Sequence, residues 1–135
     1  TACTLVANLP DIRTESDAAV NLPDALLAKW KSEGRLSEEL DELELFFDRT
    51  GYPRAPRFYI IKWLTDYVNK YGVDGFRVDT VKHANENSWA ELYKEAAAAF
   101  ELWKRKTKIR YWTTILFIWL AKCTTMAFLA DKNLI

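Results

Sequence analysis

The order of structural elements in the sequence predicts an α/β fold, either a segment of an α/β barrel or a doubly wound sheet. An apolar run at residues 73–79 has the length of a buried strand. It lies between two segments with helical spacing of apolar residues, 57–70 and 88–105. Helix, strand and helix joined by short connections are typical of units that cover a parallel sheet with helices.

The N-terminal part of the chain is expected to be a loop followed by two helices. Residues 1–23 hold two prolines and no sustained period, which indicates a loop. A first helix is expected over residues 24–32, with Gly34 in the C-cap region. A second is expected over residues 37–48, with Ser37 as its N-cap. The apolar stripe expected to be buried on this second helix comprises Leu36, Leu40, Leu43 and Phe47.

Two longer helices are expected on either side of the strand. Pro56 suits the first position of the helix over residues 57–70, and Gly72 ends it. Ser88 and Glu91 have the spacing of a capping box at the start of the next helix. We interpret the aromatic residues on both helices as core rather than as platforms for a sugar. The expected inner face of the helix before the strand comprises Tyr59, Ile60, Trp63, Leu64, Tyr67 and Val68.

The strand itself carries polar residues that an ordinary buried strand lacks. Because alternate residues of a strand share a face, Arg77 and Asp79 are expected to point to one side, while Phe76 and Val78 point toward the layer that covers the sheet. A guanidinium beside a carboxylate favours its ionised form. An ionised carboxylate shielded from water can act as a nucleophile toward a sugar carbon. The alternative is an Arg–Asp pair that only stabilises the end of the strand.

A longer stretch of sequence adds a resemblance to this pattern. Gly75–His83, Gly-Phe-Arg-Val-Asp-Thr-Val-Lys-His, closely resembles the fourth-strand signature of the α-amylase family of glycoside hydrolases. Asn8–Ile12 resembles the short Leu-Pro-Asp motif that precedes this strand, and residues 54–64 are similar to the third barrel helix of bacterial α-amylases. The resemblance spans about residues 5–106. It implies that residues 1–106 are a fragment of a (β/α)8 TIM-barrel catalytic domain, built around barrel strand 4 with its flanking helices.

The resemblance also implies an activity and the residues that perform it. The implied enzyme is a retaining glycoside hydrolase that cleaves α-1,4-glucosidic bonds in starch or maltodextrin. Asp79 would be the nucleophile, Arg77 would orient it, and Lys82 and His83 would contact the bound sugar. The second carboxylic acid that a retaining mechanism needs, roughly 5 Å away, is not in the reading frame, so the truncated chain is expected to be inactive. A transglycosylase of the same family is an alternative.

Calcium is the cofactor that the resemblance implies. The matching positions are Asp11, through its carboxylate, and His83, through its backbone carbonyl oxygen. Hard oxygen ligands suit calcium, but two of the required six to eight leave the site incomplete. Family members of this type are often periplasmic or extracellular, which leaves the compartment of this chain open.

The amino-acid composition of the chain argues against one class of binding partner. The 19 basic and 19 acidic residues give a net charge of zero, which argues against a nucleic-acid partner. The resemblance, in turn, implies an α-glucan or maltooligosaccharide as the ligand. Two cysteines do not encode a disulfide framework. The chain has no initiator methionine, which indicates a partial open reading frame.

The C-terminal segment, residues 107–135, differs in character and is expected to be an irregular apolar tail unrelated to the rest. Residues 111–130 are long enough to span a membrane, but Lys122 and four threonines within them argue against membrane insertion. The alternative function is therefore a membrane-anchored or partner-binding piece that works through this tail.

A shifted reading frame offers another explanation of the tail. When new codons are read across the residue junctions of 112–126, with permitted wobble choices, the result contains Gly-Glu-Val. This string is similar to the family's fifth-strand motif, which carries the general acid. We therefore predict that residues 107–135 are a frameshifted, non-homologous tail.

Overall fold

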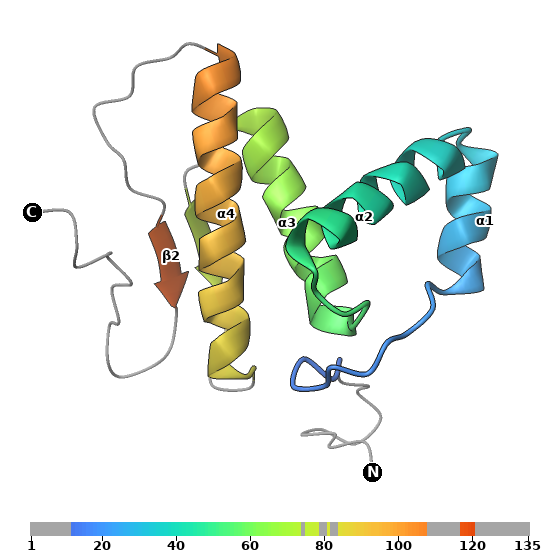
Figure 1. Cartoon of the computed structure of the whole chain (residues 1–135), viewed down its shortest axis with the longest axis horizontal. Helices are drawn as coiled ribbons and strands as arrows, with labels where there is room; N and C mark the ends of the chain where they lie inside the picture. Colours follow the sequence, from blue (N-terminus) through green and yellow to red (C-terminus); the bar gives the residue numbers. More distant parts are fainter. Residues whose placement is uncertain (1–11, 74, 79–80, 82–83, 108–116, 121–135) are drawn as a thin grey trace, which may run out of the picture. The chain divides into compact units, whose positions relative to one another are not determined.

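Helices make up most of the regular structure in the described part of the chain, which comprises residues 12–73, 75–78, 81, 84–107 and, for the backbone alone, 117–120. The structure is a computed structural model, shown in Figure 1. In chain order, its elements are α1 (Asp24–Ser32), α2 (Leu36–Thr50), α3 (Pro56–Tyr71), β1 (Gly75–Val78), α4 (Glu86–Thr107) and β2 (Phe117–Leu120).

The predicted partial TIM barrel is wrong. β1 and β2 have four residues each and pair in parallel as a two-stranded sheet, with Gly75 opposite Phe117 and Val78 opposite Leu120. A barrel needs every strand to pair on both sides until the sheet closes, whereas the described apolar side chains are buried mainly between helices. The tail is also not irregular throughout, because β2 lies within it.

The individual elements agree better with the sequence than the fold class does. Helix α1 has the predicted bounds, and α2, α3 and α4 each extend one to two residues beyond theirs at either end. Residues 12–23 hold neither helix nor strand, as predicted for that part of the loop. Apolar spacing therefore predicted where the helices lie, although it did not predict how they assemble.

The chain divides into two compact units, residues 1–62 and 63–135. The boundary falls inside α3, so its first turns belong to the first unit and its last turns to the second. The division predicted at residue 106 concerns the origin of the two segments and stays a prediction.

Aromatic side chains form much of the core of the first unit. Phe47 of α2 meets Tyr59 of α3 edge to face, with ring centroids 5.1 Å apart. Tyr52 stacks on Phe58 at 4.2 Å. Leu43 and Phe47 of the predicted stripe are buried, but Leu40 is 41% exposed and Phe46 is buried instead. The predicted N-cap is also wrong, since α2 begins at Leu36, before Ser37, and its N-cap residue makes no side-chain capping bond.

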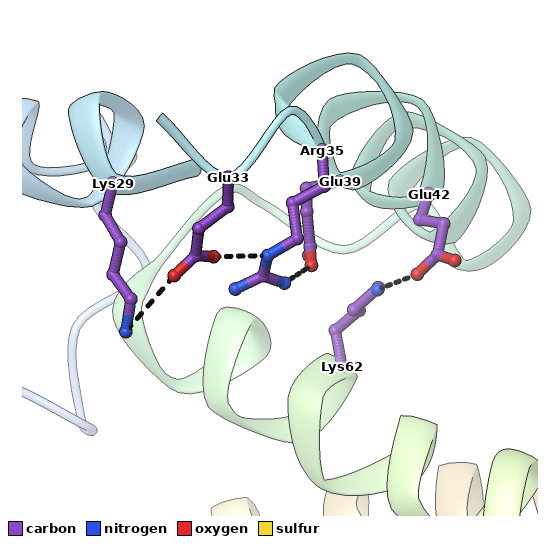
Figure 2. Close-up of polar contacts among 6 residues, drawn as sticks. All are labelled: Lys29, Glu33, Arg35, Glu39, Glu42 and Lys62. Atoms are coloured by element: carbon purple, nitrogen blue, oxygen red, sulfur yellow. Dashed lines mark hydrogen bonds and ion pairs between the residues drawn. The ribbon is translucent and has the colours of Figure 1, made fainter. Parts of the chain in front are cut away.

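Ion pairs line the surface of the first unit between α1, α2 and α3 (Figure 2). The guanidinium of Arg35 contacts Glu33 at 2.6 Å and also pairs with Glu39. Its hydrogen bond to Glu33 holds the pKa of that carboxyl below its usual range. Since Glu33 is exposed and Arg35 and Glu39 are only partly buried, these ion pairs contribute little to stability. The exception is Lys62, which is 3% exposed and whose Nζ lies 2.7 Å from Glu42 Oε2.

We expect Glu42→Gln to lower the free energy of unfolding by about 1–2 kcal/mol. The change removes the anion that faces a buried ammonium, and the loss is smaller than for a fully buried pair because the Glu42 side chain is half exposed. Thermal unfolding followed by circular dichroism measures the effect. Asp41→Asn is the matched control, because it removes the same charge from an exposed neighbour on α2. Equal melting temperatures for the two variants would contradict this account of Lys62.

The core of the second unit lies between the last turns of α3, β1 and α4. Val68, Ala96 and Phe100 are buried there, and Phe76 of β1 packs against them. The C-terminal end of α3 approaches α4 closely, since a Cβ on Gly72 would lie 2.3 Å from the ring of Trp103. Gly72 also has φ of +68°, which favours glycine. The predicted end of this helix at Gly72 is confirmed.

The start of α4 differs from the predicted capping box. The helix begins at Glu86, and the side-chain oxygen of Asn85 accepts a hydrogen bond from the backbone N–H of Asn87 at 3.0 Å. Asn85 is therefore the capping residue. Ser88 lies inside the first turn and is buried. Among the described residues, its hydroxyl oxygen has no hydrogen-bond partner.

The buried face of α3 is displaced from the predicted one. Tyr59 and Val68 are buried as expected, but Tyr67 is 56% exposed. The buried residues of α3 recur with the helical period of 3.6 residues. The face that they form is rotated by about one residue position from the predicted face. They comprise Phe58, Tyr59, Ile61, Lys62, Thr65 and Val68.

Candidate functional site

The candidate site begins at the C-terminal end of β1. In the parallel register, Arg77 lies opposite Trp119 and Val78 opposite Leu120. Because the two strands are parallel, they end at the same edge of the small sheet.

The side chain of Arg77 lies on the side of β1 that the alternation of strand residues predicted. Its side chain is exposed, whereas Phe76 packs against the core formed by α3 and α4. The planar guanidinium can therefore offer paired N–H donors to a carboxylate on the solvent-facing side of β1. The hydrophobic packing of Phe76 fixes which side of the strand Arg77 occupies.

The other predicted site residues lie outside the described residues. This applies to Asp79, Lys82 and His83, which follow β1 in the sequence, and to Asp11. Their proximity to Arg77 and to one another stays a prediction. In the sequence, Asp79 directly follows Val78, which is the last residue of β1.

The connection from β1 to α4 is short and its second half is hydrogen-bonded. The backbone N–H of Ala84 donates to the carbonyl oxygen of Val81 at 3.2 Å, and that of Ser88 donates to Asn85 at 3.0 Å. Sequence reasoning missed Asn85 as the cap, although asparagine is among the residues preferred at that position and Glu86 follows it in the first turn. This cap fixes the point where the loop after β1 enters α4.

Two buried polar groups near the start of α4 were also missed. The Ser88 hydroxyl and the Trp89 indole nitrogen are buried without a hydrogen-bond partner. Consecutive helix residues point in different directions, so these two atoms do not by themselves define a single pocket. No pattern in the sequence distinguishes them from ordinary helix residues.

The described residues contain no group of three or more His, Cys, Asp and Glu side chains arranged to hold a metal ion. The predicted calcium donors, Asp11 and the His83 carbonyl, lie outside those residues. Two oxygen donors do not fit a calcium ion that requires six to eight. We therefore derive no catalytic step through calcium.

Among the described residues, no helix combines the length and apolar character needed to cross a membrane. The tail that suggested an anchor is described only at β2, which is a strand of four residues.

Comparison with known proteins found a similarity between this chain and a glycoside hydrolase. No protein-family model matches it. A similarity to a curated protein supports a relationship to the amylases, since 39% of the residues are identical over 100 residues. That relative is the periplasmic alpha-amylase of Escherichia coli (strain K12). The matched region is 74% of this chain but spans only 13% of the relative's length.

Proposed function

We propose that the chain is part of an α-amylase-type retaining glycoside hydrolase that cleaves α-1,4-glucosidic bonds in starch or maltodextrin. The observation that carries the proposal is the 39% identity to an alpha-amylase over 100 residues. The exposed position of Arg77 at the end of β1 supports it, because the predicted mechanism needs a guanidinium beside a carboxylate on that side of the strand. Together they favour a catalytic role over a structural one.

The proposed chemistry assigns one role to each residue after β1. Asp79 attacks the anomeric carbon, and the bond to the leaving glucan breaks as the glycosyl–aspartate ester forms. Arg77 keeps Asp79 ionised and oriented. Lys82 and His83 hold the sugar next to the cleavage point. Water then hydrolyses the ester with help from a second carboxylic acid, which releases the sugar and restores the Asp79 carboxylate.

We further propose that residues 107–135 are read in a shifted frame, which removes that second acid. With permitted wobble choices, the shifted frame encodes a glutamate across the codons of Ala121 and Lys122, which follow Leu120 in the sequence.

Sequencing the encoding DNA beyond codon 106 tests this proposal against the membrane-anchored or partner-binding alternative. We expect a shifted frame to encode Gly-Glu-Val near codon 121 and to continue without an early stop. The control is the region before codon 106, where neither shifted frame should remain open with amylase-like sequence. The opposite result would be a DNA sequence in which the frame that encodes residues 107–135 stays open beyond codon 135 and the shifted frames contain stop codons. That result would support the membrane-anchored or partner-binding alternative and contradict the frameshift.

A further inference from the structure

We draw no further inference here: the strongest candidate, the buried Ser88 hydroxyl and Trp89 indole nitrogen at the start of α4, follows in sequence a loop whose residues 79–80 and 82–83 lie outside the described residues, so nothing in the structure shows which groups these two polar atoms face.

Discussion

Replacement of Asp79 by asparagine, in a protein whose reading frame has been restored, is expected to lower the rate of starch hydrolysis by at least about 10³-fold. Asparagine is nearly the same size as aspartate, so the packing around the end of β1 should survive. The amide lacks the negative charge that attacks the anomeric carbon, so the covalent intermediate cannot form. The Michaelis constant should change much less than the turnover number, because sugar contacts elsewhere remain.

The matched control for this variant is Asp74→Asn, which makes the same chemical change five residues earlier and outside the proposed chemistry. Its rate of hydrolysis should stay within a factor of two or so of the unmodified protein. If Asp79→Asn retained a tenth of the original rate, Asp79 would be a structural partner of Arg77. The nucleophile would then have to lie elsewhere in the protein.

The positions of the helices could be predicted because each has a strong local signal. Proline at the first position and glycine after the last turn bounded α3, and apolar spacing identified α2 and α4. The caps were predicted less well, since several polar residues compete at each helix start. In α4, Asn85 was the cap rather than Ser88, so the helix begins three residues earlier than the capping box implied.

The fold class could not be predicted from these local signals. The resemblance to an amylase implied a barrel, but sheet closure depends on long-range pairing of many strands. The described residues supply two strands, paired in parallel with each other. The face of α3 was misjudged for a related reason. Its sequence is apolar on more than one side, and tertiary packing decided that Thr65 is buried while Tyr67 is exposed.

One part of the candidate site followed from the sequence. The alternation of strand residues predicted that Arg77 and Phe76 face opposite ways, and the structure confirms this for both side chains. The roles of Asp79, Lys82, His83 and Asp11 came from the resemblance and stay predictions, since the positions of these residues lie outside the described part of the chain.

The central claim, that this chain is an amylase piece whose tail is out of frame, is tested most directly by comparing starch hydrolysis in two proteins. One is the 135-residue chain, and the other is the product of the same gene with its frame restored after Lys106 and its flanking codons included. We expect no measurable hydrolysis by the first. The loss of general acid–base catalysis alone is worth about 10²–10⁴-fold.

The restored protein should hydrolyse starch with retention of the anomeric configuration. Changing its restored glutamate codon, after β2, to glutamine should reduce the rate by about 10²–10⁴-fold, which separates the role of the acid from that of added length. Hydrolysis by the restored protein that depends on this glutamate is the result that the account predicts. Equal activity in the 135-residue chain and the restored protein, or a folded restored protein without activity, would contradict it.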